Sequence, residues 1–266
     1  MANFAAYGQY VFTVMKRFVI PLVLILFLCL SALVPTFRGG RGLEIPAVSP
    51  GEDTVRRTGF TLSYQRQWRI PKWVAYELEK GELDGPVPRE RFFYPDPRFP
   101  NDGADVEDYR ASGWDRGHMA PAGDMKWDAM AMRESFYFSN VCPQNRNLNN
   151  GDWHLLEKAV RRWAARYGRV YVVCGPVVTS ADSTIGRNRV VVPQAFFKAV
   201  LSSSGGGWKA AGFFFPNRAG HYPMAHYAVT VDSLESLTGI DFFPRLPDRA
   251  ERRAESELDS LFWDLW

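Results

Sequence analysis

One strongly amphipathic helix set among short apolar strands constrains the fold more than any other feature of this sequence. Over residues 150–167, large apolar side chains recur every three or four positions, which predicts a helix with one buried face. Segments typical of strands lie on both sides of it, at residues 60–64, 73–78, 170–175, 190–193, 196–201 and 210–216. Strands follow one another without a regular helix between them. We therefore expect an α+β fold with a mixed sheet, not a doubly wound one.

Shorter elements complete the expected fold. A short helix is predicted from Ala129 through Met132 and onward, and another over residues 233–239. Residues 81–113 contain five prolines and are expected to form loops. The last segment, residues 248–266, is predicted to be an amphipathic helix or a tail.

The N-terminal end of the chain differs in character from the rest. Residues 18–34 carry no charge, and their number is at the lower limit of the ~17–25 residues that span a bilayer. We expect a membrane anchor or signal segment over residues 18–37, after a tail over residues 1–17 for which Met15 is an alternative start. An uncleaved anchor is favoured, because no good small-x-small cleavage site follows. Residues 38–57 are rich in Gly, Pro, Arg and Thr, which predicts a linker.

The charge of the chain is unevenly distributed. Three of the 32 basic residues and no acidic residue lie in residues 1–40, so the net charge of +3 comes from this end alone. The other 29 basic residues balance 29 acidic ones. A polyanion such as nucleic acid would therefore have to be held by a local basic cluster and a metal ion, not by a broadly basic surface.

Cys142 and Cys174 are the two cysteines outside the apolar segment. They could pair in an oxidising compartment, but two cysteines make no disulfide framework. Unpaired cysteine is among the most often buried residue types, so two buried free thiols are the favoured interpretation.

His118 is the strongest candidate for a catalytic base. It ends the sequence Asp115-Arg116-Gly117-His118, and its imidazole can accept a proton near neutral pH. Arg116 offers a planar cation suited to phosphate, and Gly117 would let the backbone approach a ligand closely. Asp115 is expected to orient Arg116 or to cap a turn.

Asn149 is the candidate ligand of a metal ion. Magnesium prefers oxygen ligands and keeps several waters, so one amide oxygen with waters and a substrate phosphate can hold it. Glu157 lies two turns along the predicted helix, where its carboxylate could accept hydrogen bonds from water around the ion. Arg161 follows Glu157 by four residues, and this spacing alone favours a solvated salt bridge. A base, a fixed cation and an oxygen ligand together suit metal-assisted cleavage of a phosphodiester.

A zinc hydrolase is an alternative use of the remaining histidines. His154 with Glu157, or His221 with His226, could serve as ligands, but their spacing is generic. Dependence on zinc in place of magnesium would support this alternative.

Several blocks of sequence resemble, in order, the DNA/RNA non-specific endonucleases, a family that includes mitochondrial endonuclease G and secreted bacterial nucleases. The blocks lie at residues 108–118, 136–144, 148–149, 153–157, 170–176, 192–198 and 215–217. The resemblance covers about residues 60–245. It implies an endonuclease domain over residues 58–247, with a central, largely antiparallel sheet flanked by helices and a ββα-metal finger at the active site.

The resemblance also implies roles at the metal. His118 would be the general base, and Asn149 the direct ligand of Mg²⁺, with Mn²⁺ as the alternative ion. Glu157 would act through water around the ion.

Further residues would act on phosphate or on the geometry of the site. Arg116 and Arg161 would contact phosphate, and Asn140 would position His118 or the substrate. One more arginine upstream of the motif usually takes part in such sites, and the candidates are Arg89, Arg91 and Arg98.

These roles predict a magnesium-dependent endonuclease that hydrolyses DNA and RNA without sequence specificity. His118 would take a proton from the attacking water, and the products would carry 5′-phosphate and 3′-hydroxyl ends. Contacts to backbone phosphate instead of base edges imply weak sequence preference. The alternative is a non-catalytic, membrane-tethered module that captures DNA, although binding alone needs no base. A homodimer is a further expected association.

The apolar N-terminal segment predicts a catalytic domain outside the cytosol, either membrane-anchored or secreted. The segment lacks the Arg- and Ser-rich amphipathic character of a transit peptide. The bacterial periplasm or cell envelope is therefore favoured, with the mitochondrial intermembrane space as the alternative.

Overall fold

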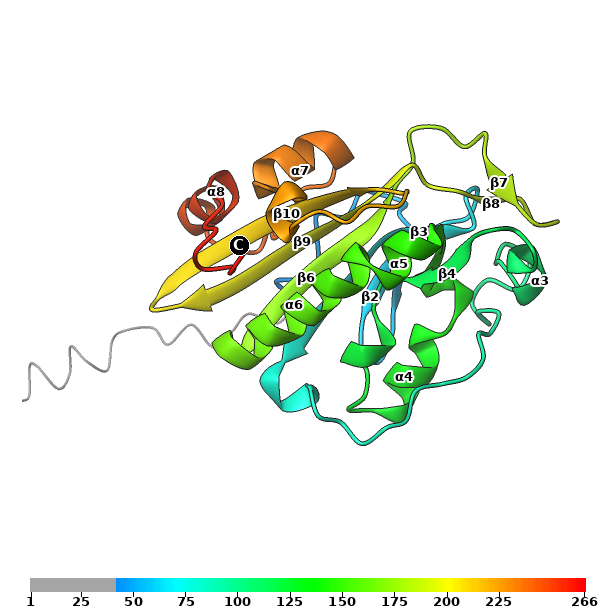
Figure 1. Cartoon of the computed structure of the whole chain (residues 1–266), viewed down its shortest axis with the longest axis horizontal. Helices are drawn as coiled ribbons and strands as arrows, with labels where there is room; N and C mark the ends of the chain where they lie inside the picture. The colour runs from blue at the N-terminus through cyan, green and yellow to red at the C-terminus, as the bar shows by residue number, and fades with distance from the viewer. Residues whose placement is uncertain (1–41) are drawn as a thin grey trace, which may run out of the picture. The chain divides into compact units, whose positions relative to one another are not determined.

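Antiparallel strand pairing dominates residues 42–266, the part of the chain that the computed structural model describes (Figure 1). In chain order the strands are β1 (Thr54–Arg56), β2 (Thr61–Gln65), β3 (Ile70–Glu79), β4 (Asp115–His118), β5 (Val141–Gln144), β6 (Arg169–Val177), β7 (Thr184–Ile185), β8 (Val190–Val191), β9 (Ala195–Ser204), β10 (Gly207–Pro216) and β11 (Ala228–Val229). The α-helices are α3 (Val106–Tyr109), α4 (Ala129–Ser135), α5 (Arg146–Asn150), α6 (Asp152–Tyr167), α7 (Val231–Thr238) and α8 (Asp248–Ser256). Short 3₁₀ turns are η2 (Lys80–Glu82), η3 (Ala122–Asp124), η4 (Phe138–Asn140) and η5 (Met224–His226).

The main sheet has seven strands in the order β1-β2-β3-β6-β9-β10-β11, and all its neighbouring strands are antiparallel. Two small sheets, β4–β5 and β7–β8, are separate from it. This arrangement confirms the predicted α+β class with a largely antiparallel central sheet.

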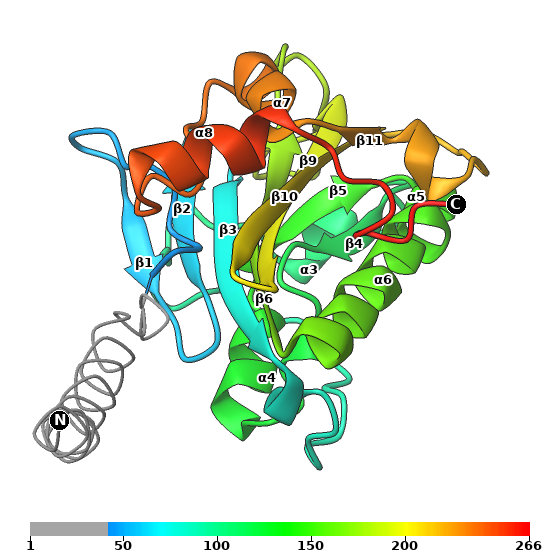
Figure 2. The same ribbon diagram turned by 90° about the vertical axis from the view of Figure 1, so that its left-hand side faces the viewer.

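Helices cover both faces of the main sheet (Figure 2). α6 packs on β3 and β6, whereas α7 and α8 pack on β10. Successive residues of β3 alternate between the two layers: Val74 and Tyr76 join the hydrophobic cluster of α6, while Trp73 and Ala75 join that of α7 and α8. The central strands are therefore apolar at nearly every position, as strands buried on both faces must be.

α6 confirms the predicted amphipathic helix. Trp153, Leu156, Val160 and Trp163, spaced by three and four residues, are each at most 3% exposed. Full burial of one such side chain stabilises the fold by about 1.5–3 kcal/mol, so this face anchors the helix. The helix ends at Gly168, whose φ of +89° is readily adopted only by glycine.

Most of the other predicted elements agree with the structure in position. Helix α3 is a difference, because it lies within residues 81–113, which were expected to form loops. Residues 190–193 contribute only the two-residue strand β8, which pairs with β7 outside the main sheet. The residue pattern did not predict strands β4 and β5, whose residues are polar or include proline and do not alternate, although the resemblance implied a ββα finger. These two strands nevertheless position the candidate site.

The predicted linker over residues 38–57 is wrong for its described part. Leu43 is 1% exposed, and β1 pairs with β2 at the edge of the main sheet. A linker was predicted because the segment is rich in Gly, Pro, Arg and Thr. Two apolar side chains within it, Leu43 and Val55, are buried in the core and hold the segment on the domain. The compact unit begins at Gly42, so the boundary expected at residue 58 falls inside it.

The last residues of the chain form a helix followed by a packed segment. After α8, Trp263 is fully buried, and its indole N–H donates to the carbonyl of Ala210 at 3.2 Å. The indole N–H of Trp163 in turn donates to the carbonyl of Trp263 at 2.9 Å. These contacts fix residues 257–266 against α6, so a frayed tail is wrong for this end.

The expected tail over residues 1–17 and the anchor or signal segment over residues 18–37 lie outside the described residues. Within residues 42–266, no helix has both the length and the apolar character needed to cross a bilayer.

Candidate active site

Strands β4 and β5 and helix α6 form a ββα unit beside the main sheet. The two strands are antiparallel, with His118 opposite Val141 and Gly117 opposite Cys142. The indole N–H of Trp153 on α6 points to the carbonyl of His118 at 3.4 Å. Gly117 is required by packing, since a Cβ there would lie 2.6 Å from the Cβ of Gln144. Gly117 does not line the cavity described below, so this packing, and not close approach to a ligand, accounts for the glycine.

His118 lines a cavity of about 710 Å³. Its ring is 7% exposed and packs against Phe136 and Phe93, at centroid distances of 4.8 and 5.1 Å. Burial, with smaller contributions from the cations of Arg89 and Arg116, lowers the pKa of His118 from 6.5 to about 3. The imidazole is therefore neutral at physiological pH. Its Nε2 is buried and has no hydrogen-bond partner among the described residues.

Arginine side chains gather in the same cavity. Its lining contains five of them, against the two carboxylates of Asp115 and Glu157: Arg89, Arg110, Arg116, Arg146 and Arg161. This is the local basic cluster that the balanced charge of the chain required. Of the three upstream arginines considered, Arg89 lines the cavity, whereas Arg91 and Arg98 do not. The guanidinium groups of Arg89 and Arg116 stack on the rings of Phe136 and Phe93, at 5.2 and 4.8 Å.

Asp115 orients the candidate metal ligand, a role that the sequence did not indicate. Its Oδ2 accepts hydrogen bonds from the side-chain amides of Asn149 at 3.2 Å and Asn150 at 3.1 Å. Its Oδ1 accepts from Nε of Arg146 at 3.1 Å. The expected partner, Arg116, is not among these contacts, because β4 directs Asp115 toward α5. The sequence could not indicate these hydrogen bonds of Asp115, because their partners lie 31 to 35 residues further along the chain.

The residues around Asn149 fit a magnesium ion. Because the Nδ2 of Asn149 is held by Asp115, the Oδ1 of the amide is free to act as a ligand. Asn149 and Glu157 both line the cavity, so a carboxylate is close enough to bind water around an ion. An amide oxygen with a nearby carboxylate is a donor set that suits a hydrated magnesium ion.

Asn140 is a positioning residue by its contacts. The side chain of Asn140 is fully buried. Its Oδ1 accepts a hydrogen bond from the backbone N–H of Ala120 at 2.9 Å. Its Nδ2 donates to the backbone carbonyls of Ala120 at 2.9 Å and Ser135 at 2.8 Å. It does not line the cavity. Of the two predicted roles, these contacts favour positioning of the segment that carries His118 over contact with the substrate.

Arg161 pairs with Asp124 instead of Glu157. Its Nη1 lies 2.6 Å from Oδ1 of Asp124, which is fully buried, and the hydroxyl of Tyr76 donates to Oδ2 of Asp124 at 3.0 Å. The predicted helix salt bridge to Glu157 is therefore wrong, because η3 brings a buried carboxylate closer. Glu157 instead lies 3.4 Å from Nδ1 of His154.

The remaining predictions for cysteine and zinc are resolved in the described residues. Cys142 and Cys174 are buried free thiols, as favoured, and burial raises the pKa of Cys174 to about 11. Within residues 42–266, neither His154 with Glu157 nor His221 with His226 belongs to a group of three potential metal-ligating side chains. The zinc alternative therefore has no assembled site in this part of the chain.

Fold and site together define a class of protein, the ββα-metal nucleases. The chain belongs to the DNA/RNA non-specific endonuclease family, whose family model matches residues 42–249.

Named relatives agree with this assignment. The chain is 35% identical over 228 residues to "Nuclease EXOG, mitochondrial" of Mus musculus, covering 79% of this chain and 62% of that protein. It is 35% identical over 209 residues to "Endonuclease G, mitochondrial" of Homo sapiens, covering 73% and 70%. A solved structure of an EndoG/EndoGI complex aligns with a TM-score of 0.71 and 29% identity, covering 78% of this chain and 91% of that one. The chain thus spans about six tenths of the length of the EXOG proteins it matches.

Proposed function

We propose that this protein is a magnesium-dependent endonuclease that hydrolyses phosphodiester bonds of DNA and RNA without sequence specificity. The observation that carries the proposal is the neutral, buried imidazole of His118, which lines a cavity together with five arginines. A module that only captured nucleic acid would need the arginines but not the base.

The residues of the cavity divide the work of in-line hydrolysis. The imidazole of His118 accepts a proton from the attacking water, and the guanidinium groups of Arg116 and Arg161 bind the phosphate oxygens. Asn149 Oδ1 would hold the ion, and Glu157 would accept hydrogen bonds from water around it. When bound, magnesium supplies positive charge that stabilises the departing 3′ oxygen. The products would carry 5′-phosphate and 3′-hydroxyl ends.

The substrate range follows from what the cavity offers. Its cations suit backbone phosphate, which DNA and RNA share and which carries no sequence information. This supports hydrolysis of both nucleic acids with weak sequence preference.

The names of the relatives bear on location. The EXOG and endonuclease G relatives are mitochondrial nucleases by name, which supports the mitochondrial intermembrane space over the bacterial periplasm as the compartment of this protein. Immunodetection in fractionated source cells tests this proposal, and recovery from a bacterial periplasm would contradict it.

Incubation of the purified full chain with supercoiled plasmid and with single-stranded RNA tests the activity. In magnesium we expect both substrates to be cut, and in EDTA we expect neither to be cut. The cut DNA ends should carry 5′-phosphates, so DNA ligase should be able to rejoin them without prior phosphorylation. Intact substrates that nevertheless bind in magnesium would instead identify a capture module.

Asp115→Asn is expected to raise the magnesium concentration for half-maximal activity by about 10- to 100-fold. The neutral amide accepts the hydrogen bonds of Asn149 and Asn150 more weakly than the carboxylate does, so the ligand oxygen is less firmly oriented. A magnesium titration of the initial rate measures the change. Asp102→Asn, a similar change outside the cavity, is the control, and an unchanged titration in Asp115→Asn would contradict the orienting role.

The acid limb of kcat/KM is expected well below pH 6.5, the usual pKa of histidine. The neutral imidazole is the active form, and the lowered pKa of His118 keeps it neutral until the pH falls toward about 3. Arg89→Ala removes one cause of the lowered pKa, so activity in that variant should be lost at a higher pH than in the unaltered protein. Arg91→Ala, outside the cavity, serves as the control. A limb at pH 6.5 or above in the unaltered protein would contradict this prediction.

A further inference from the structure

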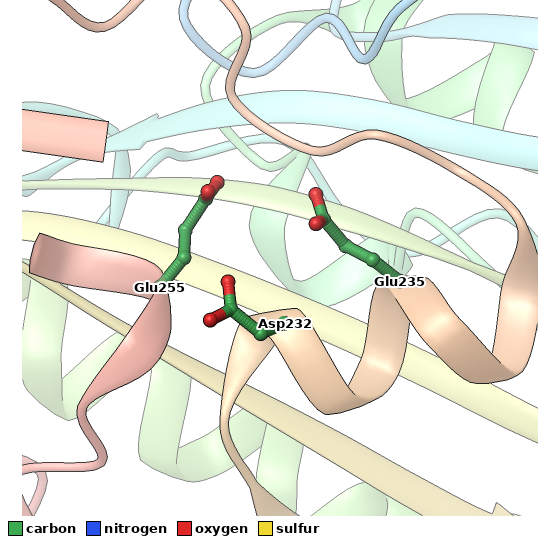
Figure 3. Close-up of side chains that lie close together, drawn as sticks. All are labelled: Asp232, Glu235 and Glu255. Atoms are coloured by element: carbon green, nitrogen blue, oxygen red, sulfur yellow. The ribbon is translucent and has the colours of Figure 1, made fainter. Parts of the chain in front are cut away.

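Three carboxylates meet between α7 and α8, on the face of the main sheet opposite α6 (Figure 3). Asp232 and Glu235 belong to α7, and Glu255 belongs to α8. Each can offer one oxygen such that the three oxygens all lie within 4.8 Å of one another. Like charges at this spacing repel, so something must offset the repulsion.

Glu255 points to a missing partner. Its side chain lies in a residue that is only 5% exposed, and its Oε1 has no hydrogen-bond partner among the described residues. Figure 3 shows its carboxylate directed toward that of Glu235. Burial, and then the neighbouring carboxylates of Glu235 and Glu251, raise the pKa of Glu255 to about 9. A buried carboxylate without a partner is strongly unfavourable, because it loses its hydration.

None of the ion pairs identified within residues 42–266 includes Asp232, Glu235 or Glu255. One oxygen of Glu235 is oriented by the backbone N–H of Phe242, which donates to it at 2.7 Å. Asp232 is exposed, so water can reach the cluster from outside.

We propose that Asp232, Glu235 and Glu255 bind a divalent cation of the calcium type, at a site separate from the catalytic cavity. Three oxygens within 4.8 Å of one another are close enough to contact one ion. Calcium accepts several carboxylate oxygens in a flexible geometry, at about 2.3–2.6 Å. Magnesium demands a near-ideal octahedron and usually keeps several waters, so a set of three protein carboxylates suits calcium better.

Such an ion would join the two helices that cover this face of the sheet. α7 and α8 both pack on β10 and contact each other, and the ligands come from both. Binding to the folded chain alone raises its stability by mass action. The site therefore stabilises the C-terminal helix of the domain against the sheet, and cleavage of nucleic acid does not depend on it.

Thermal unfolding of the full chain in calcium chloride or in EDTA tests the proposal. At a calcium concentration a hundred times Kd, we expect Tm to rise by roughly 5–10 °C. The rise should persist in Asn149→Ala, which removes the proposed catalytic ligand. It should be absent in Glu255→Gln and in Asp232→Asn. The latter alters an exposed side chain and is expected to fold. Asp241→Asn, a nearby carboxylate outside the cluster, should keep the rise.

Equilibrium dialysis with ⁴⁵Ca²⁺ gives a second readout. One bound ion should be lost in Glu255→Gln and kept in Asp241→Asn. The proposal is overturned if calcium leaves Tm of the unaltered chain unchanged, or if Glu255→Gln keeps the rise. Absence of calcium binding together with a higher Tm of Glu255→Gln in EDTA would show that a proton, not a cation, resolves the repulsion.

Discussion

His118→Ala is expected to lower kcat/KM for plasmid DNA by a factor of about 10² to 10⁴, the usual contribution of a general base. Among the histidines of residues 42–266 that line the cavity, His118 combines burial with a strongly lowered pKa. Arginines and the metal ligand remain in the variant, so substrate binding should be retained. The loss should therefore fall on kcat more than on KM.

Two controls separate this loss from misfolding. His226→Ala removes a histidine outside the cavity and should leave kcat/KM within about twofold of the unaltered protein. Circular dichroism and Tm of His118→Ala report whether the packing against Phe93 and Phe136 survives. A folded His118→Ala protein with full activity would show that the base lies elsewhere.

The sequence predicted which residues line the cavity better than it predicted their hydrogen bonds and ion pairs. His118, Arg116, Asn149, Glu157 and Arg161 all line it, as the motif suggested. The motif pointed to these residues because a base, cations and an oxygen ligand together suit cleavage of a phosphodiester. The assigned roles remain predictions until the variants are measured.

The partners of these residues could not be predicted, because they lie far away in the sequence. Helical spacing compares residues of the same helix, so it proposed Glu157 for Arg161 and could not find Asp124, 37 residues earlier. Asp115 was likewise expected to orient its neighbour Arg116 or to cap a turn, whereas the pairing of β4 with β5 turns it toward Asn149. Both errors arise from tertiary contacts that no local pattern reports.

Secondary structure was likewise predicted better in the core of the domain than at the candidate site. The central strands of the main sheet, β3, β6, β9 and β10, were predictable because burial on both faces requires apolar residues at nearly every position. β4 and β5 were not, because they serve the site and hold polar residues and Pro143. Leu43 and Val55 were hidden by the composition around them, although two apolar side chains suffice to fix that segment.

Arg161→Met is expected to lower the free energy of unfolding by about 3 kcal/mol near neutral pH, at the lower end of values for breaking a buried ion pair. It leaves Asp124, which is 0% exposed, with only the hydroxyl of Tyr76 as a partner. Burial already raises the pKa of Asp124, and Arg161 is the main opposing influence. Arg162→Met, the same change on an exposed neighbour, should alter stability by no more than about 0.5 kcal/mol. Urea unfolding measures both.

The dependence on pH and a second substitution distinguish the cause of that loss. A carboxyl whose folded pKa lies above its unfolded value binds more protons when folded, so its contribution to stability falls as pH rises through the folded value. The deficit of Arg161→Met should therefore be smallest at low pH. Adding Asp124→Asn removes the buried charge and should restore most of the stability, but not the activity, because the phosphate-binding cation is still missing. Restored activity in this double variant would show that Arg161 acts only by neutralising Asp124.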